Sequence, residues 1–422
     1  MKLLKGVSLS KWVAAYFCAV GLLALAVHKP LPEGFTKSKL DRIVMHVVEP
    51  ALRVTYYWPS RLFFSSTSGM VWWTRIVLNN LALFVGPLWN YDEQLHMETT
   101  NWEGVDVRVY SPRQNASSRG AVFFIHGGGF ALGNLVMYES LTRRIAKMLN
   151  SVVVSVEYRL SPETPYPGGI IDCEKVLEYF ISIAEEKYDV DPSKIVVMGD
   201  SAGGNLAAVI TQRRSEQNKT PDIAAQVLVY PLLQMADLQS VSYRFYQKHL
   251  EGYALVDPES VVLYYMFYAG IDMDKYRHLA KYVLTNGHVS PKDRNYINKV
   301  LNYTVFSELN YANEVLPERA PVQEHALLQE LMAPWLTNPE FSPLMRENLS
   351  GLPKAFIMTC NFDVLRDEGI MYAKRLEKAG VPVDLRNYEN GFHAMLNFHR
   401  EVEEASKALT DVVDWTLNVL RS

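Results

Sequence analysis

The sequence predicts an α/β fold, in which a mostly parallel sheet carries helices on both sides. From about residue 94 onward, short runs rich in Val, Ile and Phe alternate with segments of helical periodicity, which is typical of strand–helix–strand units. The chain has 422 residues, 49% of them hydrophobic and 12% aromatic, which is enough for a large buried core. It contains no internal repeat and no low-complexity tract, so a solenoid or a long linker is not expected.

Seven runs are expected to form the strands of this sheet. They are Val105–Tyr110, Ala121–Ile125, Ser151–Tyr158, Lys194–Met198, Ala225–Tyr230, Lys354–Cys360 and Val381–Tyr388. More than a hundred residues separate Tyr230 from Lys354, so this stretch is expected to be an insertion. Its aromatic runs SYRFYQ and LYYMFYAG are suited to cover an apolar ligand.

The predicted organisation has five parts. They are an N-terminal tip and signal-anchor segment (1–29), a helical cap region (30–93), the first part of the α/β core (94–232), a cap insertion (233–350) and the second part of the core (351–422). Between residues 31 and 91, apolar and aromatic residues recur at irregular helical spacing. We expect helices that pack on the larger core, and helices that also touch lipid are the alternative. Arg75 interrupts the second apolar run, which argues against a transmembrane span there.

The N-terminus carries a basic tip and an uncharged apolar run. Lys2, Lys5 and Lys11 precede WVAAYFCAVGLLALAV, which occupies residues 12–27. At about 1.5 Å per residue this run approaches a hydrocarbon core of roughly 30 Å, so we expect a retained single-pass type II membrane anchor. A cleaved signal peptide is the alternative, because residues 24–26 read Ala-Leu-Ala. In both cases the rest of the chain is expected in the lumen of the endoplasmic reticulum.

Glycosylation triplets and cysteine usage fit that compartment. Four N-x-S/T triplets are predicted N-glycosylation sites, at Asn115, Asn218, Asn302 and Asn348. Cys18 lies in the apolar run, so Cys173 and Cys360 are left to form one disulfide or none. The net charge of −4 gives no reason to expect nucleic acid as a partner, and the oligomeric state stays open.

The run KIVVMGDSAGGNLAAVI contains a serine between a predicted strand and a predicted helix. Gly199-Asp200-Ser201-Ala202-Gly203 fits G-x-S-x-G, the nucleophile elbow. Small residues on both sides of Ser201 let strand and helix approach closely while the hydroxyl projects from the turn. The amides at the start of the helix then face negative charge that develops beside the serine. A glycine-containing helix cap with Ser201 as N-cap is the alternative.

A second motif, FFIHGGGF, follows an apolar strand upstream. Gly127, Gly128 and Gly129 place backbone N–H groups where no side chain blocks them, so the loop can aim two amides at an oxyanion, with the amide of Ala202 as a third donor. A phosphate-binding loop is the weaker alternative, because both G-x-G-x-x-G and a following G-K-S/T are lacking. We expect His126 to brace this loop rather than to act as a base.

A serine nucleophile needs an imidazole base that is oriented by a carboxylate, and in this architecture both follow the serine in the order acid, then histidine. Asp363 comes directly after a predicted strand, whereas Asp367 and Glu368 are expected in the first turn of the next helix. His393 follows the last predicted strand on a loop, and His399 is expected in a helix. Asp363 and His393 are therefore the predicted acid and base.

The motifs HGGGF, EYRLSPE, GDSAGGNLAA, DVLRDEG and GFHAM occur in this order. Together they resemble the hormone-sensitive-lipase branch of the α/β-hydrolases. The basic tip, the single apolar segment, the PLP after it and IMTCNFDVLRDEGIMYAKRLEKAGV are similar to the group of arylacetamide deacetylase and neutral cholesterol ester hydrolase. The resemblance covers nearly the whole chain and implies an α/β-hydrolase fold.

The resemblance also implies a function. It implies a membrane-anchored lumenal hydrolase of carboxylic esters or arylacetamides with apolar groups, which works through an acyl-enzyme and needs no metal or organic cofactor. Ser201, Asp363 and His393 are then the triad, with Gly127–Gly129 and Ala202 around the oxyanion hole. A catalytically inactive, membrane-tethered adhesion or scaffold protein of the same fold is the alternative. Ala131 stands where some deacetylases have a cysteine, so a disulfide from that position to Cys360 is impossible here.

Overall fold

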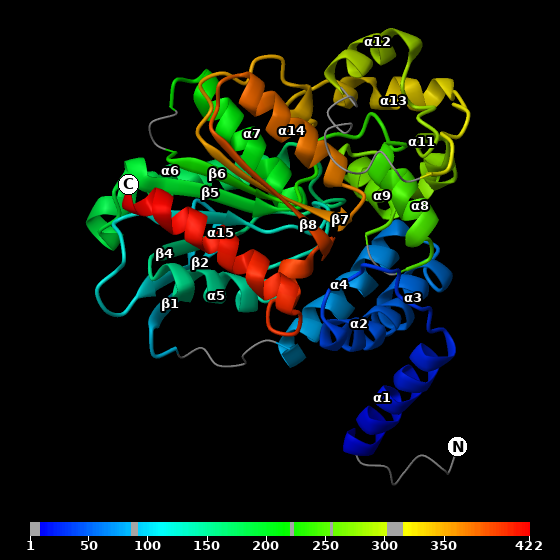
Figure 1. Cartoon of the computed structure of the whole chain (residues 1–422), viewed down its shortest axis with the longest axis horizontal. Coiled ribbons are helices and arrows are strands. Elements are labelled where there is room, and N and C mark those ends of the chain that lie inside the picture. The colour runs from blue at the N-terminus through cyan, green and yellow to red at the C-terminus, as the bar shows by residue number, and fades with distance from the viewer. Residues whose placement is uncertain (1–8, 86–91, 220–222, 254–255, 302–314) are drawn as a thin grey trace.

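The computed structural model describes the chain except for residues 1–8, 86–91, 220–222, 254–255 and 302–314 (Figure 1). Its centre is an eight-stranded sheet with the strand order β1-β2-β4-β3-β5-β6-β7-β8. The strands are β1 (Leu95–Trp102), β2 (Val105–Pro112), β3 (Ala121–Ile125), β4 (Val152–Glu157), β5 (Ile195–Asp200), β6 (Ala225–Val229), β7 (Ala355–Phe362) and β8 (Val383–Phe392). From β4 to β8 all neighbours are parallel, whereas β2 is antiparallel to both β1 and β4.

All seven predicted strands are present, and β1 is an eighth that the sequence did not reveal. Its sequence, LHMETTNW, is mostly polar and lacks the apolar run of the other strands. β1 lies at the edge of the sheet and is paired only with β2, so most of its side chains face solvent at least in part. A half-exposed edge strand carries too few apolar residues to be recognised from the pattern alone.

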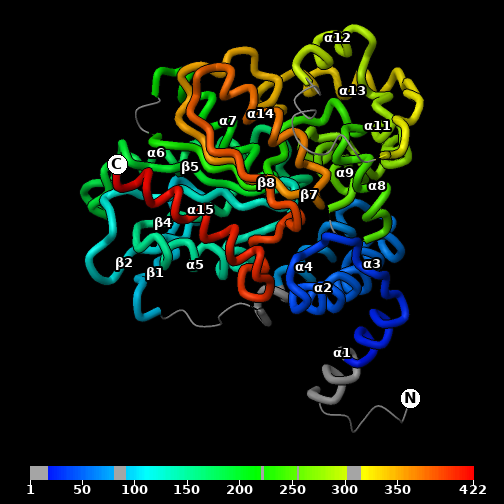
Figure 2. The backbone as a smooth tube through the Cα atoms, viewed as in Figure 1, coloured from blue at the N-terminus to red at the C-terminus, as the bar shows by residue number. Residues whose placement is uncertain are grey.

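Helices cover both faces of the sheet (Figure 1). One face carries α5 (Glu139–Leu149) and α15 (Glu403–Arg421), which contact each other as Figure 2 shows. The other carries α6 (Gly168–Tyr188), α7 (Ala202–Glu216) and α14 (Arg366–Lys378). Because β3, β5 and β6 are buried along their whole length, their residues are apolar or small, with Asp200 and Gln226 as the exceptions.

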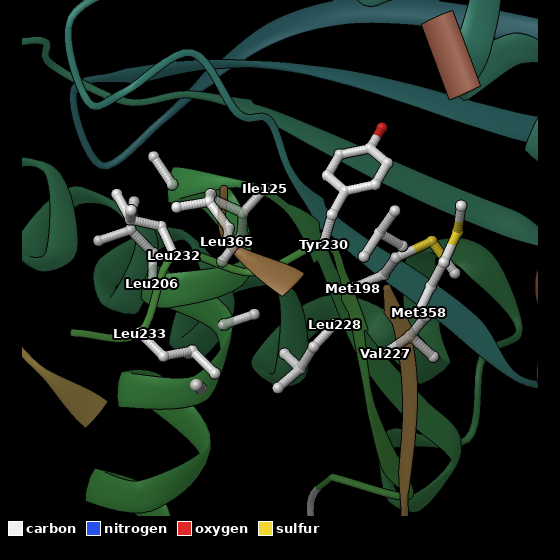
Figure 3. Close-up of a cluster of buried hydrophobic side chains, with 14 of the residues drawn as sticks. Ile125, Met198, Leu206, Val227, Leu228, Tyr230, Leu232, Leu233, Met358 and Leu365 are labelled. Atoms are coloured by element: carbon white, nitrogen blue, oxygen red, sulfur yellow. The ribbon is translucent and has the colours of Figure 1, made fainter. Parts of the chain in front are cut away.

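The core under the candidate site consists of large apolar side chains from adjacent parallel strands (Figure 3). Met198 of β5 is paired with Val227 of β6, Val229 of β6 is paired with Met358 of β7, and all four residues are buried. Close packing of this kind fixes the carboxyl ends of the strands relative to one another. Residues placed just after those ends are therefore held at defined distances.

Two groups of helices lie at the carboxyl ends of the strands. The N-terminal group comprises α1 (Leu9–Ala26), α2 (Lys39–Leu52), a π-helix (Arg53–Tyr57), α3 (Trp58–Leu62) and α4 (Thr67–Val85). The insertion between β6 and β7 contains α8 (Val241–His249), α9 (Pro258–Tyr268), α10 (Met273–Tyr276), α11 (Ala280–Val283), α12 (Pro291–Val300) and α13 (Ala326–Leu336). The two groups contact each other through the ion pair of Arg61 with Asp257.

No helix in the described part of the chain is both long and apolar enough to cross a membrane. Three of the four predicted glycosylation sites, Asn115, Asn218 and Asn348, are exposed, and Asn302 lies outside the described residues. Cys173 and Cys360 are both buried and free, so the structure contains no disulfide between them.

Candidate active site

Ser201 occupies the sharp turn between β5 and α7. Its backbone has φ 54° and ψ −121°, a conformation that side chains rarely adopt, and its side chain makes no capping hydrogen bond. Gly199 and Gly203 permit this turn. A Cβ on Gly199 would lie 2.2 Å from the carbonyl oxygen of Gly203, and one on Gly203 would lie 2.1 Å from that of Ile125. The turn is therefore a nucleophile elbow in geometry as well as in sequence.

The structure brings the three predicted residues of the triad together. His393 Nε2 lies 3.0 Å from Ser201 Oγ, and His393 Nδ1 lies 2.8 Å from Asp363 Oδ2. All three side chains are buried, with 8% of Ser201 exposed. Because a carboxylate only accepts, the Nδ1 nitrogen carries the hydrogen and Nε2 is free to accept the serine proton.

The loop positions of Asp363 and His393 follow from the sheet. Asp363 comes directly after β7, and its second oxygen, Oδ1, accepts the backbone N–H of Leu365 at 2.8 Å. His393 comes directly after β8. His399, expected in a helix, instead follows a short 3₁₀ helix (Met395–Phe398) and bonds to the carbonyl of Leu396.

Asp367 and Glu368 stand in the first turn of α14 as expected, but both are buried. Asp367 accepts the backbone N–H of Ser242, and Glu368 accepts that of Gln234, at 2.7 and 2.8 Å. Burial raises the pKa of Glu368 well above its ordinary value. These acids hold the start of the insertion rather than serving only the helix dipole.

The glycine loop lies beside Ser201 but only part of it faces the serine. Gly128 and Gly129 have φ values of 111° and 62°, and both line the same pocket as Ser201. The N–H of Gly127 instead donates to Asp200 Oδ1 at 2.8 Å. Gly127, predicted among the residues around the oxyanion hole, therefore does not offer a free amide to an oxyanion, and the two loop amides left for that role are those of Gly128 and Gly129.

Asp200 and Tyr138 are site residues that the sequence reasoning missed. The Asp200 carboxylate accepts the Gly127 N–H through Oδ1 and the Tyr138 hydroxyl, 2.9 Å away, through Oδ2. Burial raises the pKa of Asp200 to about 6. The sequence feature that could have pointed to Asp200 is its position directly before Ser201, within the G-x-S-x-G motif. Tyr138 carried no signal, because its role depends on where α5 begins.

His126 is buried and packs against the side of the glycine loop. Its ring stacks on Tyr158, with 4.4 Å between ring centroids, and its Nδ1 lies 2.8 Å from the carbonyl oxygen of Gly127. The Tyr158 hydroxyl donates to the carbonyl of His126. Burial lowers the pKa of His126 to about 4, so the ring stays neutral near pH 7. The contacts are those of a brace.

A cavity of about 280 Å³ opens over Ser201, and its walls are mainly apolar. The sequence reasoning placed aromatic cover in the insertion, and Leu263 and Tyr264 of α9 do line the cavity. The N-terminal helices, predicted as a helical cap region, supply a larger share of the wall than the insertion does. Their lining residues are Leu52, Tyr56, Ser60, Arg61, Met70, Val71, Thr74 and Leu78.

Arg75 of α4 fastens these helices to the glycine loop. It donates to the carbonyl of Ala131 at 2.7 Å, to that of Ser161 at 2.9 Å, and to both carboxylate oxygens of Glu163. The arginine that interrupts the apolar run of α4 thus has three partners in the core. Among the described residues, no group of three or more His, Cys, Asp or Glu side chains could hold a metal ion.

In comparisons with known proteins, the matching family and the similar proteins are all hydrolases. The family description "alpha/beta hydrolase fold" matches residues 122–294 and 307–397. Neutral cholesterol ester hydrolase 1 of Mus musculus is 36% identical over 312 residues, which are 71% of this chain and 73% of that protein. Arylacetamide deacetylase of Rattus norvegicus is 35% identical over 315 residues, 72% of this chain and 76% of that protein.

Solved structures agree in fold. A hyperthermophilic esterase of Pyrobaculum calidifontis superimposes with a TM-score of 0.60 at 25% identity, covering 87% of this chain and 96% of its own. The family match spans more than half of the chain, and the two curated relatives align with over two thirds of it. The chain therefore belongs to the α/β-hydrolase-fold family, in the group of esterase-type hydrolases that includes neutral cholesterol ester hydrolase and arylacetamide deacetylase.

Proposed function

We propose that this protein hydrolyses carboxylic esters, arylacetamides or both, with apolar acyl or aryl groups, through an acyl-enzyme on Ser201. The observation that carries the proposal is the continuous chain of contacts from Ser201 through His393 to Asp363, at 3.0 and 2.8 Å. This chain lies at the floor of a mainly apolar cavity. Both curated relatives are named for hydrolysis of an ester or removal of an acetyl group.

Acylation begins when His393 Nε2 takes the proton of Ser201 and Oγ attacks the carbonyl carbon of the substrate. The carbonyl oxygen becomes an oxyanion, which accepts hydrogen bonds from the backbone amides of Gly128, Gly129 and Ala202. Asp363 stabilises the imidazolium that has formed. The imidazolium then gives its proton to the leaving alcohol or amine as the bond to the carbonyl carbon breaks, which leaves the acyl group on Ser201.

Deacylation repeats the sequence with water. His393 takes a proton from water, the hydroxide attacks the acyl carbon, and the oxyanion again meets the three amides. His393 returns the proton to Ser201 Oγ as the bond between Oγ and the acyl carbon breaks, and the carboxylic acid is released. All proton transfers thus pass through one imidazole, which a buried carboxylate keeps in one tautomer.

The cavity favours an apolar substrate because its wall gains free energy from burying apolar surface. Leu78, Leu132, Val136, Leu141 and Leu263 are among the side chains that a chain or ring would contact. Ester and amide substrates place the same carbonyl at the serine and differ only in the leaving group. We therefore propose the class of substrate and leave the leaving group open.

We further propose that the catalytic part works in the lumen of the endoplasmic reticulum, with residues 12–27 as a single-pass anchor. The uncharged run and the lysines before it support this proposal. The exposure of Asn115, Asn218 and Asn348 is compatible with glycosylation there. Mobility shifts after glycosidase treatment, and protease protection in sealed microsomes, would test the topology directly.

The proposed function is tested with Ser201→Ala. We expect it to abolish hydrolysis of p-nitrophenyl esters, with a loss of up to about 10⁶-fold in kcat, as is typical when a triad serine is removed. A fluorophosphonate probe should label the parent protein and leave the variant unlabelled. The same assay is run with p-nitrophenyl esters of increasing acyl length and with an arylacetamide. We expect faster hydrolysis of esters with acyl chains longer than acetate.

The control is Ser140→Ala, because this hydroxyl also lines the cavity but does not contact His393. It should keep both labelling and turnover. An inactive scaffold protein is the alternative function, and it predicts no probe labelling of the parent. Activity of Ser201→Ala within tenfold of the parent would also contradict the proposal.

A further inference from the structure

Exposed apolar side chains are concentrated on the N-terminal helices. On α2, Leu40, Ile43 and Val47 are 66%, 62% and 65% exposed. Their spacing of three and four residues places them on one face of the helix, the face opposite buried Met45. The outward face of a helix on a soluble core normally carries charged and polar residues. On α2 it is apolar instead.

The pattern continues on the neighbouring elements. At the end of α3, Leu62 and Phe63 are exposed, and on α4, Trp72 and Ile76 are exposed one turn apart. Phe64 packs against Trp72, which joins the end of α3 to α4. We call the set Leu40, Ile43, Val47, Leu62, Phe63, Trp72 and Ile76 the apolar outer face.

Charge is absent from this face. Between residues 40 and 79, every exposed residue is apolar or a serine, the serines being Ser65, Ser66 and Ser68. The three arginines of this stretch that are not fully buried bond inward. Arg42 donates to backbone carbonyls of residues 31, 32 and 35, Arg61 pairs with Asp257, and Arg75 pairs with Glu163.

The apolar helix α1 joins the same end of the molecule (Figure 1). The buried guanidinium of Arg53 pairs with Glu49 and donates to the carbonyl of Val27 at 3.0 Å, so the end of α1 is held against α2. In the described part of α1, Leu22 and Leu25 are 70% and 75% exposed. Exposed apolar side chains are therefore present on α1 as well as on the apolar outer face.

Basic side chains border this surface. Lys37 and Lys39 are exposed at the start of α2, and Glu33 is the single exposed acid between residues 28 and 39. Lysines beside an apolar helical face are typical of elements that lie in the interface of a bilayer containing anionic lipids. Because homodimer interfaces are also apolar, a second copy of the chain is the competing occupant, and the test below separates the two.

We propose that the apolar outer face docks on the surface of a phospholipid bilayer, with its helices lying in the interface rather than spanning it. The inner faces of the same helices line the cavity over Ser201, through Leu52 of α2 and Met70 and Thr74 of α4. Docking places one face of these helices in lipid and the other beside the candidate nucleophile. The proposal concerns binding and stands whether or not Ser201 is catalytic.

The test uses the full chain with Cys18→Ser, which removes the one exposed cysteine. Val47→Cys or Ile76→Cys then carries an environment-sensitive NBD fluorophore, and Ile171→Cys is the matched control. Ile76 and Ile171 are the same residue type, both 36% exposed, on α4 and on the distant α6. Each protein is reconstituted into vesicles of phosphatidylcholine and phosphatidylserine, with or without doxyl-labelled lipid that quenches NBD in contact with it.

We expect the doxyl lipid to remove most of the NBD emission at positions 47 and 76 and little at position 171. Because the anchor segment alone could hold every variant on the vesicle, it is this difference between positions that supports docking. Equal quenching at all three positions, or none at 47 and 76, overturns it. So does a concentration-dependent blue shift in detergent without vesicles, which would assign the face to a second copy of the chain. Melting curves of the labelled variants confirm that they are folded.

Discussion

At the scale of single residues, Asp200 links the two halves of the candidate site. It is the last residue of β5 and directly precedes Ser201, while its carboxylate accepts the amide N–H of Gly127 at the start of the glycine loop. The hydroxyl of Tyr138 occupies the second oxygen. Because its pKa of about 6 lies below neutrality, the carboxylate is mostly ionised at pH 7, and both hydrogen bonds are charge-assisted. Asp200 is thus a positioning residue for the amides of Gly128 and Gly129.

Asp200→Ala should therefore lower kcat while KM for a small ester changes little. Loss of the anchor at Gly127 lets the amides of Gly128 and Gly129 move, and misplacing such a donor costs on the order of 10² in kcat. Asp200→Asn should recover part of that loss, because its carbonyl oxygen can still accept from Gly127. The measurement is kcat and KM for p-nitrophenyl acetate. Equal activity of Asp200→Ala and the parent, or equal damage in both variants, would contradict this role.

At the scale of elements, the elbow depends on close approach of β3, β5 and α7. The carbonyl oxygens of Ile125 and His126 lie 2.1 and 2.6 Å from where a Cβ on Gly203 would be. Only glycine fits there without moving the end of β3, which leads into the glycine loop.

Gly203→Ala should consequently destabilise the fold by about 1–3 kcal/mol, the usual cost of overpacking a buried site. It should also reduce fluorophosphonate labelling, since α7 and the glycine loop are forced apart. Gly21→Ala is the control, because no atom lies within 4 Å of its would-be Cβ. Urea unfolding of both variants measures the difference, and an unchanged midpoint for Gly203→Ala would refute the packing argument.

The sequence predicted those parts of the fold and site that depend on short-range patterns. The buried parallel strands were predicted because their runs are continuously apolar, and the order of Ser201, Asp363 and His393 followed from the ends of three strands. β1 was missed because an edge strand can be polar. The catalytic roles of the three residues are still proposals.

What the sequence did not predict depends on contacts between distant segments. The amide of Gly127 turns to Asp200, 73 residues away, and no local pattern encodes that pairing. Part of the cavity wall comes from helices between residues 52 and 78, whose irregular apolar spacing predicted packing but not what they pack around. Asp367 and Glu368 had the pattern of first-turn acids, and only the fold reveals their buried partners.

At the scale of the whole molecule, buried histidines make stability depend on pH. His288 in the insertion is buried, and its Nε2 donates to the carbonyl of Met235 at 2.8 Å. Burial lowers the pKa of His288 to about 4, whereas in the unfolded chain it is near 6.5. Between these two values the unfolded chain binds a proton that the folded chain does not. The contribution of His288 to the free energy of unfolding is therefore full above pH 6.5 and decreases as the pH falls toward 4.

His288→Gln keeps a donor for Met235 and removes this titration. For each unit by which the pH falls within that window, the free energy of unfolding of the parent should decrease by about 1.4 kcal/mol more than that of the variant. The difference in melting temperature between the two proteins should accordingly narrow as the pH is lowered from 7 to 5. The exposed His278→Gln serves as the control. A difference that stays constant across this range would show that His288 does not titrate in this way.

The buried acids of α14 hold the insertion in place beside the cavity over Ser201. Asp367 and Glu368 hold the backbone of Ser242 and Gln234, and the Ser242 hydroxyl donates to the carbonyl of Val364 at 2.6 Å. The root of the insertion is thus tied to the loop that carries Asp363, and swinging it outward would strand buried carboxyl groups without partners. On the opposite wall, Arg75 holds α4 to the glycine loop through Ala131 and to Glu163, so both walls of the cavity are tied to the segments that carry the candidate site.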